Sequence, residues 1–369
     1  MGPRATAQFA LVALWQKRGL LSRLLAPLAS LHRAWRAWVT WAYRVGLLRS
    51  YRAGVPVIVI GNLYIGGTGK TPLAIELVRQ LRARGWQPGI VSRGYRASKS
   101  DAAKSMAREV DGNGTAAEFG DEPLLLAQAT GVPVVIGRDR VAAVKLLLNV
   151  HHRVDVIVTD DGLQHRRLAR DIELALVHYR GLGNGWMLPA GPLREPPQRL
   201  QSVDAVVFHD QLDTPRPLVR VHSPFYGMRT ALGDVCGLKD TSLKISLAQL
   251  AREQLASNLR IVAACGIGMP DRFFAMLRAA GLTFDAIALA DHYSYSANPF
   301  ADRAFDWALI TEKDAVKCRA NAALAADRRI GVVPLVARLD TGLIDFVEAR
   351  LKAARGTPTE VMSHGSATA

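Results

Sequence analysis

The segment that most constrains the fold is residues 57–78, VIVIGNLYIGGTGKTPLAIELV. The apolar run over 55–60 predicts a buried parallel strand, and apolar residues at helical spacing predict a helix from about Thr71 to Gly85. A glycine-rich turn between them lets backbone N–H groups approach an anion, while a lysine reaches the terminal phosphates and a threonine hydroxyl suits Mg²⁺. The segment therefore predicts a phosphate-binding loop whose nucleotide-binding residues are Gly66, Gly67, Thr68, Gly69, Lys70 and Thr71.

This loop departs from the strict phosphate-binding motif at one position. The motif places a glycine at position 64, where this chain has Tyr64, and Gly61, Gly66 and Gly67 are the nearby substitutes. A glycine-rich turn with an incidental lysine is the alternative interpretation. The strand before the turn and the helix after it favour the phosphate site.

Similar apolar runs alternate with helical periods along the rest of the chain. Strands separated by helices predict parallel sheets with right-handed crossovers. A length of 369 residues exceeds the roughly 250 residues of a single core, so we predict an α/β fold with two domains. The predicted parts are a P-loop parallel-sheet domain over 51–215, an interdomain connection over 216–245, a second, smaller α/β domain over 246–352 and a flexible tail over 353–369. Predicted strands lie at 89–92, 132–136, 154–159, 172–177, 205–208, 261–265, 284–289, 307–311 and 330–336, and 97–117 is predicted to be a loop or weak hairpin.

Positive charge is concentrated in the first fifth of the chain. The net charge is +15, yet the first 72 residues carry ten basic and no acidic residues, which leaves only +5 for the remainder. Four tryptophans and a series of leucines at helical spacing lie among these charges. This pattern predicts that residues 1–50 form a basic amphipathic helical segment that associates with a membrane surface. The alternative is an amphipathic helix packed on the protein's own core.

Composition excludes several other classes of protein. No apolar stretch reaches the ~18 residues of a membrane-spanning helix, and the flanks of 9–15 do not resemble a cleaved signal peptide. Cys236, Cys265 and Cys318 have no CxxC spacing, so neither a disulfide framework nor a zinc ribbon is predicted. A nucleic-acid binder would spread its basic residues along one face, whereas here most of the excess positive charge lies at one end of the chain.

Two acidic motifs predict the chemistry of the site. In VDVIVTDDGLQH, residues 154–165, Asp160 and Asp161 follow an apolar strand, where P-loop proteins place a carboxylate on Mg²⁺; a helix cap or turn is the alternative. In GDEP, residues 120–123, Asp121 is a candidate base and Glu122 a candidate metal ligand or orienting group. Alone, this second motif is more typical of a helix N-terminus.

Taken together, the motifs resemble one family. GNLYIGGTGKTP, SRGY (92–95), GDEP, GRDR (137–140), DDGLQH, LPAGPLREP (188–196), DHYSY (291–295) and TEKDAVK (311–317) occur in the order of the tetraacyldisaccharide 4'-kinase family of lipid A biosynthesis. The resemblance extends over about residues 10–350. DDGLQH and PAGPLREP are not general features of P-loop proteins, which makes the resemblance specific.

The resemblance implies transfer of the ATP γ-phosphate to the 4'-hydroxyl of a tetraacylated glucosamine disaccharide 1-phosphate, which forms lipid IVA. It implies ATP and Mg²⁺ as cofactors, and a location on the cytoplasmic face of a Gram-negative inner membrane, with the N-terminal helix on the bilayer. Neither nucleic acid nor an obligate protein partner is expected. By motif matching, the catalytic residues are Asp121, His292 and Lys70, the Mg²⁺ environment is Thr71, Glu122, Asp160 and Asp161, and the candidate substrate contacts are Arg93, Gln164, His165, Arg194 and Glu195.

Two alternatives remain open at this point. A P-loop ATPase or GTPase could act as a switch or metallochaperone without modifying a lipid, although the chain has no Cys/His cluster of the kind a metallochaperone uses. For the TEKD segment, the pattern favours a strand end and helix cap over a nucleotide contact.

Overall fold

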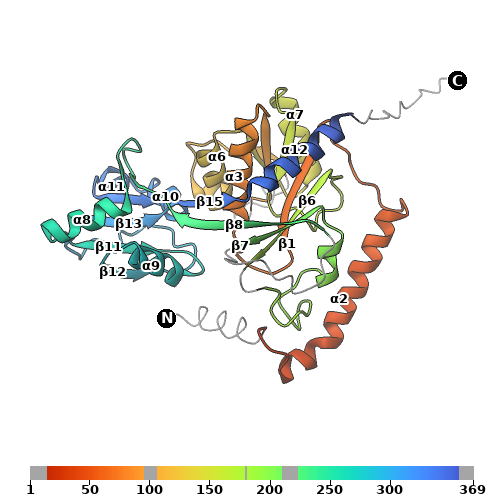
Figure 1. The fold of residues 1–369 in the computed structure, drawn as a ribbon, viewed down its shortest axis with the longest axis horizontal. Coiled ribbons are helices and arrows are strands. Elements are labelled where there is room, and N and C mark those ends of the chain that lie inside the picture. Colours follow the sequence, from red (N-terminus) through yellow and green to blue (C-terminus); the bar gives the residue numbers. More distant parts are fainter. Residues whose placement is uncertain (1–14, 95–105, 179–180, 210–222, 357–369) are drawn as a thin grey trace.

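The structure, a computed structural model, describes residues 15–94, 106–178, 181–209 and 223–356. Within these residues the strands form two sheets, which are the centres of the two lobes in Figure 1. The larger sheet has the order β15-β8-β7-β6-β1-β5-β2-β4-β3 and the smaller has the order β10-β9-β14-β13-β11-β12. The strands of the larger sheet are β1 (Val57–Asn62), β2 (Pro88–Ser92), β3 (Arg108–Glu109), β4 (Val134–Ile136), β5 (Val156–Thr159), β6 (Ile172–His178), β7 (Ala205–His209), β8 (Phe225–Leu232) and β15 (Leu335–Leu339).

The larger sheet is parallel except at its two edges, where β15 and β3 run antiparallel to their neighbours. Strand β1 is buried on both faces, since Ile58 and Ile60 join one core cluster and Val57 and Val59 join the other. This double burial is why the strand has an uninterrupted apolar sequence. One face is covered by α3 (Lys70–Ala83), α6 (Asp121–Thr130) and α12 (Thr341–Gly356), and the other by α7 (Arg140–Val150).

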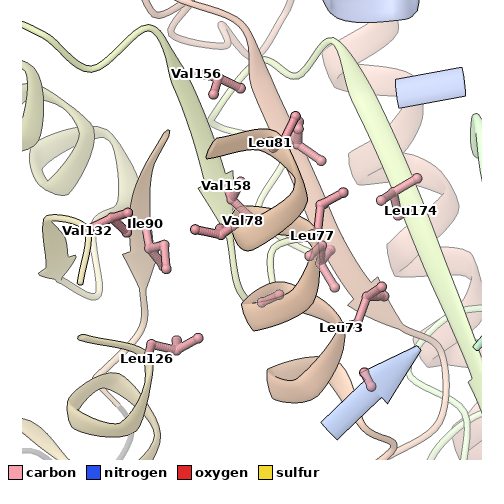
Figure 2. Packing of buried hydrophobic residues seen from close by; sticks show 14 of the residues in the cluster. Leu73, Leu77, Val78, Leu81, Ile90, Leu126, Val132, Val156, Val158 and Leu174 are labelled. Atoms are coloured by element: carbon pink, nitrogen blue, oxygen red, sulfur yellow. The ribbon is translucent and has the colours of Figure 1, made fainter. Parts of the chain in front are cut away.

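Helix α3 presents its apolar face to the sheet at the point where the phosphate-binding loop ends. Leu73, Leu77 and Leu81 are fully buried and pack against strand residues such as Val158 and Leu174 (Figure 2). Their spacing of four residues places them one turn apart on the same face. The helix is thereby held rigidly with its N-terminus at the carboxyl end of β1.

The smaller sheet is sandwiched between two pairs of helices. Helices α8 (Leu247–Ser257) and α9 (Pro270–Ala279) pack on one face, and α10 (Glu312–Cys318) and α11 (Ala322–Ala326) pack on the other. Its central strands are parallel, and β9 and β10 are antiparallel additions at one edge. The strands of this sheet are β9 (Val235–Gly237), β10 (Lys244–Ile245), β11 (Ile261–Cys265), β12 (Asp285–Ala288), β13 (Trp307–Thr311) and β14 (Ile330–Val333).

The connections between the two sheets differ from the predicted boundaries. The predicted strand 330–336 is interrupted at Pro334, so that β14 belongs to the smaller sheet and β15 to the larger one. Likewise β8, within the predicted connection 216–245, is a strand of the larger sheet, paired with β7 and β15. Figure 1 shows β8 and β15 running side by side between the lobes. Proline lacks an N–H for the hydrogen-bond ladder, which explains why β14 ends before Pro334.

The C-terminal helix also lies outside its predicted domain. Leu343, Val347 and Leu351 of α12 are buried in the same cluster as Leu73 and Leu77 of α3. The segment from 335 onward therefore completes the larger lobe instead of the second domain predicted for 246–352. The helix continues to Gly356, which shortens the predicted tail over 353–369, and the remainder of that tail lies outside the described residues. Residues 97–105 of the predicted loop 97–117 also lie outside them, and the rest contains β3 and the start of α5 (Ala116–Phe119).

Helix α2 (Leu20–Arg44) is a rod at the margin of the larger lobe (Figure 1). Its buried residues are Ser22, Ala29 and Ala42, so its closely packed side carries small side chains. Eight of its large apolar side chains are 46–77% exposed, namely Leu20, Leu21, Leu24, Leu28, Leu31, Trp35, Trp38 and Trp41. The predicted helix is therefore present, but these leucines and tryptophans do not pack on the protein's own core. No helix in the described part of the chain is both long and apolar enough to cross a bilayer.

Candidate active site

The phosphate-binding loop is held by an asparagine at the end of β1. Asn62 Nδ2 donates to the Tyr64 carbonyl at 2.6 Å and to Thr68 Oγ1 at 2.8 Å, and its Oδ1 accepts from Lys70 Nζ at 3.1 Å. Asn62 is fully buried, so these contacts are made without competition from water. The side chain thus links both ends of the loop and orients the lysine, even though Tyr64 stands where the strict motif has glycine.

The loop ends at Gly69, which precedes the first turn of α3. Gly69 has φ +98° and Gly66 has φ +103°, a left-handed conformation that glycine adopts without steric cost. Among the described residues, no side chain caps the N-terminus of α3. Its free N–H groups and the positive end of the helix dipole are the features of a phosphate site.

Asp160 follows β5, the strand adjacent to β1, and is 3% exposed. Its Oδ1 has no hydrogen-bond partner among the described residues. Burial and the nearby charge of Glu122 raise the pKa of Asp160 to about 7, against the opposing charge of Lys70. A buried carboxyl with an unused oxygen and a raised pKa would be stabilised in its charged form by a cation.

Asp161, the next residue, is held as an anion. Arg194 Nη1 lies 3.1 Å and 2.9 Å from its two carboxylate oxygens, and Lys70 Nζ lies 3.6 Å from Oδ1. Burial opposes ionisation of Asp161, but the charges of Lys70 and Arg194 outweigh it and lower the pKa below its usual range. Its backbone adopts φ +55°, which turns the chain sharply between the two acids.

The oxygen atoms of Asp160 and Thr71 are suited to bind a magnesium ion. No group of three or more His, Cys, Asp or Glu side chains in the described ranges is arranged to hold a metal by itself. Magnesium in phosphoryl-transfer sites is instead held by one or two carboxylates together with substrate phosphates and water. The unsatisfied oxygen of Asp160 and the buried hydroxyl of Thr71, at the start of α3, supply oxygen donors of this kind.

Asp121 and His292 meet across the two lobes. His292 Nδ1 lies 2.8 Å from Asp121 Oδ2, although the residues are 171 positions apart in the sequence. Asp121 begins α6, and His292 follows β12 in a left-handed conformation, φ +59°, with its backbone N–H bonded to the Gly266 carbonyl. The pairing expected from the DHYSY and GDEP motifs is therefore present.

Two lysines of α10 reach the same carboxylates from the smaller lobe. Lys313 Nζ lies 2.5 Å from Glu122 Oε1, and Lys317 Nζ lies 3.9 Å from Asp121 Oδ2. Burial opposes ionisation of Asp121, but the hydrogen bond from His292 and the charge of Lys317 lower its pKa. The charge of Lys313 likewise lowers the pKa of Glu122. Glu122, expected near Mg²⁺, is thus engaged by a lysine in this structure.

The TEKD segment supports these lysines. Thr311 Oγ1 accepts from the Asp314 backbone N–H at 3.2 Å, so this segment is a strand end and helix cap, as the pattern favoured. Asp314 is fully buried; its Oδ2 accepts from Thr311 Oγ1 and from the Gly266 N–H, and its Oδ1 lies 3.0 Å from Lys317 Nζ. Lys317 is 5% exposed and is therefore a buried cation paired with Asp314 and directed toward Asp121.

The remaining predicted residues lie in two places. Gln164 Nε2 donates to the Asn62 carbonyl at 3.3 Å, beside the phosphate-binding loop. His165 is half-buried, and burial together with the charges of Arg140 and Arg93 lowers its pKa to about 4, so its ring is neutral at pH 7. Arg93 itself is exposed.

Glu195 is bound by arginine side chains. It is 2% exposed and accepts from Arg36 of α2 at 2.5 Å and from Arg199 at 3.1 Å. Its neighbour Arg194 binds Asp161, so the LREP segment connects the acidic site to the N-terminal helix. Of the predicted substrate residues, Glu195 is thus placed to fix α2.

Sequence reasoning missed three residues of the site. Asn62 lies inside the quoted motif but has no role in the general P-loop pattern, and only its buried contacts identify it. Lys313 and Lys317 are four residues apart and so share one face of α10, which is a detectable signal. The spacing alone does not place the two lysines in the site, because the sequence does not show that this face meets α6.

The fold and the site define a P-loop kinase of the α/β class. A family model described as Tetraacyldisaccharide-1-P 4'-kinase (LpxK) matches residues 21–352. The chain belongs to this family, whose members phosphorylate a lipid A precursor with ATP.

Individual relatives agree with the family assignment. A tetraacyldisaccharide 4'-kinase of Herminiimonas arsenicoxydans is 46% identical over 92% of this chain and 94% of its own length. The protein of that name in Janthinobacterium sp. (strain Marseille) is 44% identical over 95% of this chain and 97% of its own. A crystal structure of LpxK from Aquifex aeolicus in complex with ATP superposes with a TM-score of 0.75 at 27% identity, covering 90% of this chain and 100% of that one.

Proposed function

We propose that the chain transfers the γ-phosphate of ATP to the 4'-hydroxyl of a tetraacylated glucosamine disaccharide 1-phosphate. The observation that carries this proposal is the 2.8 Å contact between Asp121 and His292, in a site that also includes a phosphate-binding loop. Asp121 is a carboxylate whose lowered pKa keeps it ionised at neutral pH, and it is therefore available to accept a proton.

In this proposal Asp121 accepts the proton of the 4'-hydroxyl, and the oxygen of that hydroxyl attacks the γ-phosphorus. The bond between that phosphorus and the β,γ-bridging oxygen breaks, and ADP leaves. His292 orients the carboxylate of Asp121 through its Nδ1. Lys70, directed by Asn62, neutralises charge on the terminal phosphates together with the N–H groups of residues 66–71.

The proposal includes a magnesium ion held by Thr71, Asp160 and Asp161. When bound, the ion would neutralise charge on the β- and γ-phosphates. Glu122 is not placed among these ligands, but its charge interacts with those of Asp160 and Lys70. Its ion pair with Lys313 makes it an orienting residue between the lobes.

We also propose that α2 lies on the cytoplasmic face of a Gram-negative inner membrane. Its exposed leucines and tryptophans would enter the boundary between headgroups and acyl chains, and its arginines would meet anionic headgroups. A lipid acceptor supports this proposal, because its acyl chains can remain in the bilayer while its sugar reaches Asp121.

A direct assay tests the kinase proposal. Purified protein, Mg·ATP and tetraacyldisaccharide 1-phosphate should yield a product with a second phosphate by mass spectrometry. Asp121→Asn should lose the product, whereas Asp302→Asn, an exposed site in the smaller lobe, should keep it. ATP hydrolysis by the wild type without any phosphorylated lipid would favour a P-loop NTPase switch instead.

A further inference from the structure

A chain of hydrogen bonds lies behind the phosphate-binding loop and crosses from one lobe to the other. His209, the last residue of β7, is 2% exposed; its Nδ1 lies 2.7 Å from the Thr68 carbonyl and its Nε2 lies 3.1 Å from Thr230 Oγ1. Thr230, in β8, accepts in turn from Arg272 Nη2 at 2.8 Å. Arg272 belongs to α9 of the smaller lobe, so the chain connects that helix to the loop.

The chemistry of the end groups assigns a direction to this chain. A carbonyl can only accept, so the proton on His209 is at Nδ1 and is donated to Thr68. Arginine can only donate, so the Thr230 oxygen accepts from Arg272, and its hydroxyl hydrogen is free to be donated to Nε2 of His209. An Nδ1–H imidazole, which donates to Thr68 and accepts from the Thr230 hydroxyl, satisfies all three bonds in one arrangement.

The bond to Thr68 acts on the part of the loop that faces the nucleotide. In a planar trans peptide the C=O and the following N–H point in opposite directions. Holding the Thr68 carbonyl toward β7 therefore directs the Gly69 N–H away from β7. The Gly69 N–H can then act together with the uncapped N–H groups at the N-terminus of α3. Thr68 is held a second time through its hydroxyl, which accepts from Asn62 at 2.8 Å.

The imidazole also fills the space beside Gly69. A Cβ added at Gly69 would lie 2.6 Å from Cε1 and Nδ1 of the His209 ring. The ring therefore contacts the glycine backbone directly, and its position limits how the peptide can rotate.

We propose that His209 is a positioning residue for the triphosphate of the nucleotide, with its tautomer set by Thr230 and Arg272. Through this chain, α9 of the smaller lobe determines the orientation of the Thr68–Gly69 peptide in the larger lobe. The inference rests on the proposed function, since it requires ATP to bind at this loop.

Thr230→Val tests the proposal, because it removes the hydroxyl and keeps the shape of the side chain. We expect Thr230→Val to raise the dissociation constant of ATP, measured by calorimetry, and the KM for ATP on the order of fivefold to tenfold. The KM for the lipid acceptor and the melting temperature without nucleotide should stay near their wild-type values. Thr230→Ser should restore ATP binding, and Thr283→Val, at an exposed position of the smaller lobe, is the matched control.

Arg272→Met provides a second, independent variant. It should weaken ATP binding in the same direction, and the double variant with Thr230→Val should be no weaker than the more affected single one, because both break one chain. The proposal would be overturned if Thr230→Val bound ATP with a dissociation constant within twofold of wild type, or if Thr230→Ser weakened ATP binding as much as Thr230→Val. It would also be overturned if the effects of Thr230→Val and Arg272→Met on ATP binding were additive in the double variant. A wild-type protein that binds no ATP would instead overturn the proposed function, so the two failures are distinguishable.

Discussion

The imidazole of His292 lies 2.8 Å from the carboxylate of Asp121 and joins the two lobes at the proposed reaction centre. The same carboxylate lies 3.9 Å from Lys317, which is itself paired with the fully buried Asp314. Asp121 is thus fixed by its position on α6 and by two side chains of the smaller lobe. Loss of any of these contacts should have a specific and measurable effect.

Asp121→Asn should lower kcat about 10²- to 10⁴-fold, because the amide cannot accept the hydroxyl proton. The dissociation constant of ATP should change by less than about threefold, since the phosphates are bound by the loop and Lys70. Single-turnover kinetics and calorimetry measure the two quantities. Turnover near the wild-type rate would remove Asp121 from the mechanism.

Lys317→Met should move the acidic limb of the pH profile of kcat/KM to higher pH by about 0.5–1 unit. The charge of Lys317 helps to lower the pKa of Asp121, so its removal raises that pKa, and the ionised base is then lost at a higher pH as the solution is acidified. Lys317→Arg keeps the charge and should leave the limb in place.

A stability control is needed for Lys317→Met, because it leaves the buried Asp314 without its cation. Breaking a buried pair in this way costs about 3–5 kcal/mol. The double variant Asp314→Asn/Lys317→Met should recover most of that loss and still show the shifted limb. If its acidic limb coincides with that of the wild type, Lys317 does not control the pKa of Asp121.

Asp160→Asn should stabilise the metal-free protein at pH 8 by about 1–3 kcal/mol while abolishing the effect of Mg²⁺ on its melting temperature. The folded pKa of about 7 lies above the ordinary value of 3.8, so between these values the folded state holds a proton that the unfolded state has released. Wild-type stability therefore falls as the pH rises through this window, and the neutral amide removes that loss.

Thermal unfolding of both proteins with EDTA at pH 5 and pH 8 checks this prediction. The stability gained by the asparagine variant should be larger at pH 8 than at pH 5. An equal gain at both pH values would mean that the asparagine acts through packing instead of charge.

Replacing Trp35, Trp38 and Trp41 together by alanine should reduce binding to phosphatidylethanolamine/phosphatidylglycerol vesicles about tenfold or more. These side chains are 46–59% exposed, so the substitution should change the melting temperature little. Co-sedimentation measures vesicle binding, and ATP affinity serves as the control for the site. Unchanged sedimentation would contradict the membrane-surface proposal for α2.

Several features of this protein could be predicted from local sequence. The phosphate-binding loop, the acidic pair after β5 and most strands of both sheets follow from short patterns of apolar, glycine and acidic residues. Such patterns are reliable because the period of a strand or helix and the φ freedom of glycine are properties of neighbouring residues. The GDEP and DHYSY motifs also led to the expected pairing of Asp121 with His292, through family resemblance.

Other features were decided only by the tertiary structure. Three of them join segments far apart in sequence. The chain passes from the smaller sheet to the larger one at Pro334, Lys313 and Lys317 contact the acids of α6, and Arg272, Thr230 and His209 form one hydrogen-bonded chain. Likewise, the sequence predicted an amphipathic α2, but only its contacts with the larger lobe, such as that of Arg36 with Glu195, show which side is turned outward. The physical reason is the same in each case: a buried charge or hydrogen bond depends on which elements the folded chain brings into contact, and no local periodicity encodes that choice.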